Sequence, residues 1–190
     1  MTPTYRAQTA TLQRCLDSTS RQTFTDFEHL VCSDGEEEPL ARHLVHSYDH
    51  RFRYLYTGRP DLNHGNGVRR YLLEKASGEF IVFLDADNFL LPSYLEKMRR
   101  ALEQDVRAGF AVCEILHYGP LLPAHGRPPV VLRGEFRLGY IDTLQVMSRV
   151  SAIRDVGWRG FEYAADAETY MALEKRYRFV RVPECLCVHC

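Results

Sequence analysis

The sequence predicts an α/β fold with a mostly parallel central sheet flanked by helices. Helical and extended segments alternate through the first half of the chain, mostly with short connections. Residues 80–84 are five consecutive apolar residues, rich in β-branched and aromatic types, and predict a strand buried on both faces, as parallel strands are. The chain has 190 residues, 45% of them hydrophobic, which is enough for one domain with a substantial core.

The elements of the first half follow from apolar spacing. Helices are expected where apolar residues recur at intervals of three and four, and strands where short apolar or alternating runs end in turn residues. The expected order is a helix through 12–19, a strand at 27–32, a helix at 39–48, a strand at 52–56, a loop at 57–67, a helix ending at 76 and the strand at 80–84.

The second half alternates less regularly and predicts a small mixed sheet. Ser93 and Glu96 form a capping-box pattern at the start of a helix. The other expected elements are a strand at 110–115, a proline- and glycine-rich loop at 118–134 with an edge strand at 130–132, a strand at 141–147, a short helix at 151–156, a helix at 165–177 and a final strand at 179–182.

Composition and charge exclude several classes of protein. The net charge of −1 gives no electrostatic basis for binding nucleic acid or an anionic membrane. The sequence has no run of about 18 apolar residues, so we expect no transmembrane segment, and it has no secretory signal. We therefore expect a cytoplasmic location, including the inner face of a membrane. Cys185, Cys187, His189 and Cys190 could bind zinc, but without a second ligand pair this is disfavoured.

Two carboxylates, Asp85 and Asp87, follow the strand at 80–84. They lie just past its carboxyl end, where open α/β sheets bind ligands. An acidic pair there can hold a divalent cation, which prefers oxygen ligands. It can equally form a turn with a helix cap. The residues alone leave both interpretations open.

Several short motifs, in order and at matching spacing, resemble the inverting family-2 glycosyltransferases of the GT-A fold. The resemblance covers nearly the whole chain, although each motif is weak alone. The motifs are Pro3-Thr4-Tyr5-Arg6, Gln22-Thr23-Phe24-Thr25-Asp26-Phe27-Glu28, Cys32-Ser33-Asp34-Gly35, Arg69, and Ala76-Ser77-Gly78-Glu79-Phe80 leading to Asp85-Ala86-Asp87.

This resemblance implies a GT-A (Rossmann-like) domain over residues 1–190, with a nucleotide-binding half at 1–90 and an acceptor half at 91–190. It implies transfer of a sugar from a nucleotide-diphosphate sugar, with a UDP-sugar favoured, to an acceptor hydroxyl with inversion. Mn²⁺ or Mg²⁺ is the expected cofactor. The expected acceptor is a glycan or a lipid-linked glycan in bacterial polysaccharide biosynthesis.

The resemblance also implies residue roles at the donor diphosphate. Asp87 would bind the cation, which would bridge the diphosphate oxygens, and Asp85 would lie closer to the ribose. His189 resembles a late histidine that some members use as a further metal ligand, which suits Mn²⁺ better than Mg²⁺.

The nucleotide base would be recognised by residues near the amino-terminal end. Asp34 would accept a hydrogen bond from the ring N–H, which favours uracil, unless it is only a turn residue. Thr4 and Tyr5 would frame the base, with Tyr5 offering a stacking face. Arg69 would contact the base edge or the diphosphate, or would be an ordinary solvated helix residue.

An inverting transfer needs a base that takes the proton of the acceptor hydroxyl. The family places a Glu-Asp pair at the start of the last helix. Here Ala165 replaces the Glu, and Asp166 is the candidate base. Asp166 could instead be the helix N-cap, with Glu168 as the alternative base.

Two further residues are candidates for the acceptor site. Asp142 resembles a family position under the acceptor, and an ordinary strand-end Asp is an equal alternative. Trp158 would stack on an acceptor sugar, or would pack in the core.

Two departures from the family leave alternatives open. The first family strand is apparently missing, because only Met1 and Thr2 precede the Pro-Thr-Tyr loop, and the Glu before Asp166 is absent. A catalytically inactive domain that binds nucleotide-sugar or glycan is therefore the main alternative. A sugar-phosphate nucleotidylyltransferase is disfavoured because the sequence has no glycine-rich basic loop near its start.

Overall fold

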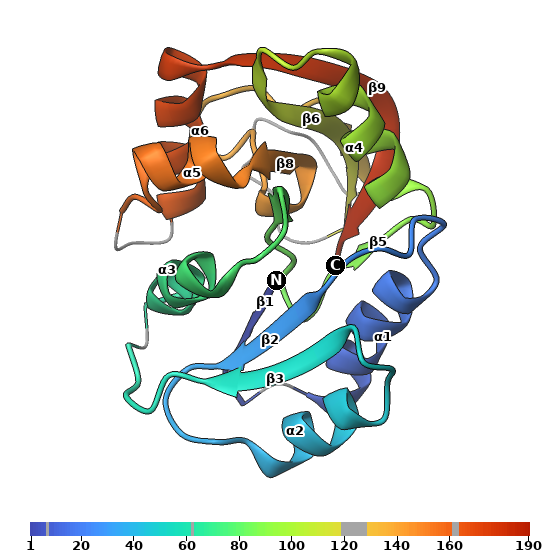
Figure 1. The fold of residues 1–190 in the computed structure, drawn as a ribbon, viewed down its shortest axis with the longest axis vertical. Helices are drawn as coiled ribbons and strands as arrows, with labels where there is room; N and C mark the ends of the chain where they lie inside the picture. Colours follow the sequence, from blue (N-terminus) through green and yellow to red (C-terminus); the bar gives the residue numbers. More distant parts are fainter. Residues whose placement is uncertain (7, 62, 119–128, 161–163) are drawn as a thin grey trace.

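The computed structural model describes residues 1–6, 8–61, 63–118, 129–160 and 164–190, and its strands form two sheets (Figure 1). The first sheet is parallel, in the order β1 (Thr2–Thr4), β2 (His29–Ser33) and β3 (Phe52–Tyr56). The second sheet is mixed, in the order β4 (Phe80–Val82), β8 (Val146–Arg149), β6 (Ala108–His117), β9 (Arg178–His189) and β5 (Phe89–Leu90), with β7 (Val130–Leu132) paired to β6. The predicted α/β class is confirmed.

Helices cover both faces of the first sheet. Successive side chains of β2 point to opposite faces, so Val31 packs with α1 (Thr9–Ser20) and α2 (Pro39–His46). Leu30 and Cys32 pack on the other face against α3 (Asn66–Lys75). This is the arrangement predicted from the alternating segments.

The second sheet is covered in the same way. Alternate residues of β6, such as Ala111 and Cys113, pack with α4 (Tyr94–Gln104). Phe110 and Val112 pack against α5 (Val150–Val156) and α6 (Ala165–Arg176) on the opposite face. The 3₁₀ helix η2 (Thr143–Gln145) precedes β8. No helix among the described residues is long and apolar enough to cross a membrane.

The strand that leads to the acidic pair differs from its prediction. β4 contains three residues and pairs antiparallel with β8, so it belongs to the mixed sheet, which is larger than expected. The predicted burial on both faces is only partly correct. Ile81 is buried, whereas Phe80 and Val82, on the other face of β4, are half-buried and line a cleft.

The prediction that the first strand is missing is corrected to a short strand. Residues Thr2–Thr4, expected as a loop, pair in parallel with Val31–Ser33. The Met1 amino group donates to Val82 O (2.8 Å), and Leu84 N donates to Met1 O (2.9 Å), so Met1 joins the two sheets. Beside it, a cleft of about 720 Å³ separates His29 of β2 from β4.

Two local predictions also change. Ser93 is the N-cap of α4, but its side chain makes no capping bond, and Glu96 accepts from Thr23 Oγ1 (2.6 Å). The last strand is longer than expected and includes Cys185 and Cys187. The edge strand at 130–132 is confirmed, whereas most of the predicted loop at 118–134 lies outside the described residues.

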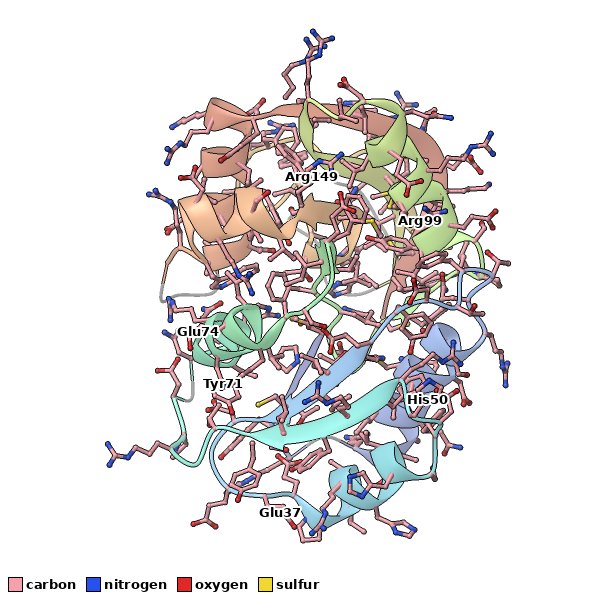
Figure 2. All side chains as sticks on the ribbon, viewed as in Figure 1. Glu37, His50, Tyr71, Glu74, Arg99 and Arg149 are labelled. Atoms are coloured by element: carbon pink, nitrogen blue, oxygen red, sulfur yellow. The ribbon has the colours of Figure 1, made fainter. Side chains whose placement is uncertain are left out.

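Arg149, at the end of β8, links α4 to both neighbouring strands (Figure 2). Its guanidinium donates to Leu102 O (2.8 Å) at the carboxyl end of α4 and to Ala108 O (3.0 Å) of β6. It also pairs with Glu79 (2.6 Å), just before β4. These contacts hold the end of the sheet that lies opposite the acidic pair.

Candidate active site

All the predicted site residues line one cleft of about 1120 Å³. They come from the ends of β1 and β2, from α3, from the turn after β4, from the loop before η2, from the start of α6 and from the end of β9. The residues are Thr4, Tyr5, Asp34, Arg69, Asp85, Asp87, Asp142, Trp158, Asp166 and His189. The fold therefore brings together side chains that are spread over nearly the whole sequence, from Thr4 to His189.

The carboxyl ends of β1 and β2 form one end of the cleft. Thr4 is buried, and its Oγ1 lies 3.1 Å from the Ser33 hydroxyl. Asp34 N donates to Thr4 O (2.8 Å), and Asp34 Oδ1 accepts from Asp61 N (2.7 Å). Tyr5 is 48% exposed, so its ring presents a face to the cleft.

Arg69 is buried in the cleft wall and is not a solvated helix residue. Its guanidinium forms an ion pair with Asp85, donates to His64 O (2.7 Å) and lies 5.2 Å from the centroid of the Trp158 ring. The position of Asp85 is therefore set by a charge-assisted hydrogen bond.

Asp87 is exposed to the cleft, whereas Asp85 is partly buried by its partners. The walls of the cleft still bury part of the Asp87 carboxylate. This partial burial, and then the charge of the neighbouring Asp85, raise the pKa of Asp87 above its ordinary value. Asn88 N donates to Asp85 O (3.1 Å), so the pair does form a turn. The turn and cleft interpretations are thus compatible.

Asn88 attaches the acidic turn to the residue that follows β9, a role that no local sequence pattern indicates. Its side chain is fully buried, and its Oδ1 accepts from Cys190 N (2.9 Å). Its Nδ2 is buried without a hydrogen-bond partner in the part of the chain that the structure describes. Asn88 also lines the cleft.

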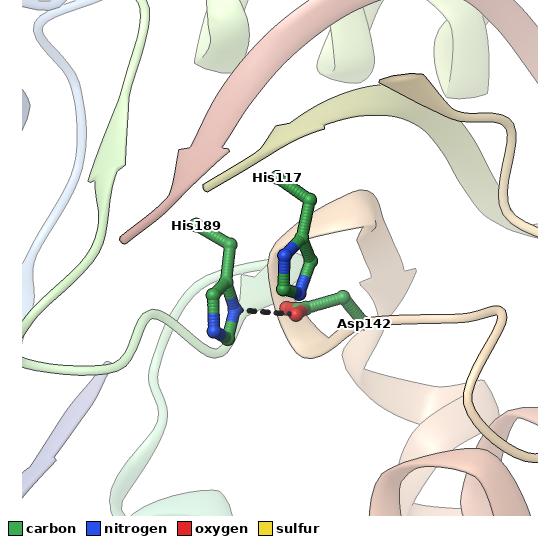
Figure 3. Close-up of side chains that lie close together, drawn as sticks. All are labelled: His117, Asp142 and His189. Carbon is green, nitrogen blue, oxygen red and sulfur yellow. Dashed lines mark hydrogen bonds and ion pairs between the residues drawn. The ribbon is translucent and has the colours of Figure 1, made fainter. Parts of the chain in front are cut away.

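Asp142 and His189 form an ion pair beside His117 (Figure 3). His189 Nδ1 lies 2.8 Å from Asp142 Oδ2, and Leu144 N donates to Asp142 Oδ1 (3.0 Å). Burial would raise the pKa of Asp142, but the bonds to His189 and Leu144 N outweigh it and lower that pKa. Burial likewise would lower the pKa of His189, but Asp142 raises it.

Gln145 holds the Asp142 turn and was not predicted. It is fully buried, accepts from Asp142 N (3.1 Å), and donates to Cys113 O (2.9 Å) and Leu132 O (3.1 Å).

We expect Gln145→Leu to leave these groups unpaired and to destabilise the fold by about 2–4 kcal/mol. A thermal melt should show this loss against Gln104→Leu, an exposed control; equal melting temperatures would contradict it.

Asp166 lies in the first turn of α6, where Ala164 is the N-cap. Its Oδ1 accepts from the backbone N–H of the next residue, Ala167 (2.7 Å). Because Ala164 holds the N-cap position, Asp166 is not the N-cap. Burial, and then the charge of Asp142, raise the pKa of Asp166 to about 7. Glu168 is exposed and is not among the described residues that line the cleft.

Trp158 was predicted either to stack on an acceptor sugar or to pack in the core, and its contacts favour packing. The side chain is 5% exposed, and its ring packs edge-on against Phe83 (4.6 Å between centroids) and Tyr170 (6.1 Å). Its Nε1 donates to Asn66 Oδ1 (2.9 Å). With Arg69 over its ring, Trp158 supports the cleft wall and offers little area to a sugar.

Sequence comparisons identify a family that is consistent with this fold. Residues 1–154 match glycosyl transferase family 2, and the chain belongs to that family. It is 30% identical over 125 residues to the GalNAc(5)-diNAcBac-PP-undecaprenol beta-1,3-glucosyltransferase of Campylobacter jejuni, which covers 63% of this chain and 38% of that protein. It is 31% identical over 94 residues to WfgD of Escherichia coli, a UDP-Glc:alpha-D-GlcNAc-diphosphoundecaprenol beta-1,3-glucosyltransferase. That match covers 50% of this chain and 36% of WfgD.

Solved structures share the fold. TarS 1-349 of S. aureus in complex with UDP has a TM-score of 0.78 at 17% identity, covering 99% of this chain and 58% of that one. The mannosyltransferase PcManGT of Pyrobaculum calidifontis, in complex with GDP-Man and Mn²⁺, has a TM-score of 0.71 at 18% identity, covering 98% and 55%. These likenesses show the GT-A fold. The chain spans under two fifths of the length of the curated relatives described above.

Proposed function

We propose that this chain transfers a sugar from a nucleotide-diphosphate sugar, with a UDP-sugar favoured, to an acceptor hydroxyl with inversion at the anomeric carbon. The observation that carries the proposal is the convergence of an exposed Asp87 and a carboxyl group of raised pKa, Asp166, in one cleft. A cation site and a base are the two groups that such a transfer needs.

The donor would lie with its base between Tyr5 and Asp34. Tyr5 offers a half-exposed ring for stacking. A uracil N–H would bond to the Asp34 carboxylate, which lines the cleft and accepts from Asp61 N. Arg69 and the buried Asn88 Nδ2 are donors along the path toward the acidic turn, which suits an anionic diphosphate.

The donor set of the cleft fits a divalent cation. Asp87 offers an exposed carboxylate, and His189 adds an imidazole that lines the same cleft. Oxygen ligands with an imidazole suit Mn²⁺, and carboxylates alone also suit Mg²⁺. Asp87 and His189 would hold the ion, which when bound supplies charge stabilisation to the departing diphosphate.

Asp166 would act as the base. Its carboxylate takes the proton of the acceptor hydroxyl, while the acceptor oxygen forms a bond to the anomeric carbon. The bond from that carbon to the diphosphate oxygen breaks on the opposite face, and the nucleoside diphosphate leaves with the electron pair. Asp142 lies beside this region and tunes Asp166 through its charge; Trp158 would support the same wall.

We propose a glycan or lipid-linked glycan as acceptor, in bacterial polysaccharide assembly. The support is the two relatives whose names specify undecaprenol-linked sugar acceptors. The site of action would then be cytoplasmic, at the inner face of a membrane.

The direct test is turnover by the purified chain. UDP-, GDP- and dTDP-sugars are offered with Mn²⁺ and an undecaprenyl-diphosphate sugar, and the released nucleotide and the anomeric configuration of the product are measured. We expect UDP release with inversion. Donor binding without release would instead support an inactive nucleotide-sugar-binding domain, and no binding of any nucleotide would overturn the proposal.

Asp34→Asn tests the base contact separately. Loss of a charged acceptor should weaken UDP binding by about tenfold or more, while the Asn oxygen can still accept from Asp61 N. Calorimetric titration of UDP checks this, with the exposed Glu36→Gln as control. Unchanged affinity in Asp34→Asn would remove Asp34 from the base site.

A further inference from the structure

We propose that His117, Asp142 and His189 form a three-ligand site for a transition-metal ion that is occupied before any nucleotide binds. We call these residues the His–Asp–His cluster. The proposal deepens the proposed function, because it names the metal class of that cleft and adds two ligands that the sequence did not indicate.

Strand register places the two histidines together. His117 ends β6 and His189 ends β9, and the two are direct partners in the parallel ladder between these strands. Partners in adjacent strands point to the same face of a sheet. Their rings accordingly stack, with centroids 4.0 Å apart and an interplanar angle of 11°.

Asp142 approaches both ring edges from a different element. It is the N-cap of η2, where Leu144 N and the Gln145 side chain fix its turn. Figure 3 shows its carboxylate beside the two rings, on the side to which His189 Nδ1 points. Three elements thus deliver three potential ligands to one point.

The spacing is close to that of a bound ion. One ligand atom from each residue lies within 4.8 Å of the others. Metal–ligand bonds of about 2.0–2.2 Å put two ligands of one ion at most about 4.4 Å apart. The stacked rings must tilt before a lone pair of each ring can point at one ion. The ion then replaces the proton that His189 and Asp142 share, and that proton leaves to solvent.

Two imidazoles and one carboxylate select a particular kind of metal. Nitrogen ligands favour Mn²⁺, Co²⁺ or Zn²⁺ over Mg²⁺, which prefers oxygen. Three protein ligands leave coordination positions open. Because all three residues line the donor cleft with Asp87, an ion held there would meet the diphosphate when the donor enters.

The test uses Co²⁺ alone as probe, without nucleotide. Visible absorption of the titrated chain should show one bound Co²⁺ per chain, which excess Mg²⁺ does not displace. Asp142→Asn and His117→Gln should each weaken binding at least about tenfold. Cys190→Ser, a control for the neighbouring exposed thiol, should leave it unchanged.

The outcomes separate this inference from the proposed function. Should Co²⁺ bind only with UDP present, and be lost in Asp87→Asn but not in Asp142→Asn, the three-ligand site is refuted while the transferase proposal stands. Equal binding by both cluster variants and the wild type also refutes it. Thermal melts identify any variant that fails to fold; Asp142→Asn keeps the acceptor for Leu144 N, so it serves if His117→Gln unfolds.

Discussion

Asp166→Asn should lower kcat/KM for sugar transfer by about 10²–10⁴-fold, the usual contribution of a positioned general base. An amide cannot take the acceptor proton, although it can still accept from Ala167 N as the carboxylate does. Donor binding should be unaffected, so the loss should appear in kcat. The measurement is initial-rate kinetics with a saturating donor.

The pH profile should carry the signature of the same group. The base acts when deprotonated, and its pKa lies at about 7. Activity of the wild type should therefore rise with pH up to about 7 and then level off. Asp166→Asn should lose this ascending limb. Glu168→Gln, in the same turn but exposed, should keep both rate and profile; loss of activity there would make Glu168 the base instead.

Stability should change in the opposite direction. The folded pKa of about 7 is raised above the ordinary 3.8, so the folded state holds a proton more tightly than the unfolded state. Stability is then lost as pH rises from about 3.8 to 7, and the deficit is complete above 7. Asp166→Asn removes this deficit. Its melting temperature at pH 8 should exceed that of the wild type by about 2–4 °C for each kcal/mol regained, and the gain should vanish near pH 4.

Asp87→Asn should reduce metal-dependent transfer by about 10³-fold or more, since a cation at the leaving diphosphate supplies several kcal/mol to the transition state. Asn keeps the size of the side chain but not its charge. Because the carboxylate is exposed and partly repelled by Asp85, the fold should be unharmed or slightly more stable. Nucleotide release in the presence of Mn²⁺ is the measurement.

Asp26→Asn is the matched control for Asp87→Asn, because Asp26 is exposed in the connector before β2. It should retain full activity. If Asp87→Asn turns over at the wild-type rate with Mn²⁺, the acidic pair is only the turn that Asn88 N closes.

The sequence was informative about the site because the motifs lie where strands end. Asp34 and Asp87 follow β2 and β4, which belong to different sheets but whose carboxyl ends open on the same cleft. Hence a linear pattern could identify residues that converge in three dimensions. The apolar run at 80–84 likewise indicated a strand at the core, although only one face of β4 is fully buried.

Other features depend on pairing that no local pattern encodes. The antiparallel pairing of β4 with β8 joins segments almost 70 residues apart. His117 becomes a neighbour of His189 only through the register of β6 with β9. Gln145 is polar yet fully buried, so its role depends on two acceptors from other elements, Cys113 O of β6 and Leu132 O of β7. The sequence was equally consistent with Trp158 in the core and with Trp158 on an acceptor sugar. Its ring contacts favour packing in the cleft wall.

The most direct measurement is the affinity of the chain for UDP with and without Mn²⁺, by calorimetry on wild type and Asp87→Asn. Binding energies are reciprocal, so a shared site requires each ligand to strengthen the other. We predict that Mn²⁺ strengthens UDP binding by about tenfold or more in the wild type and little in Asp87→Asn. A UDP affinity that is the same with and without Mn²⁺ in the wild type would contradict the account.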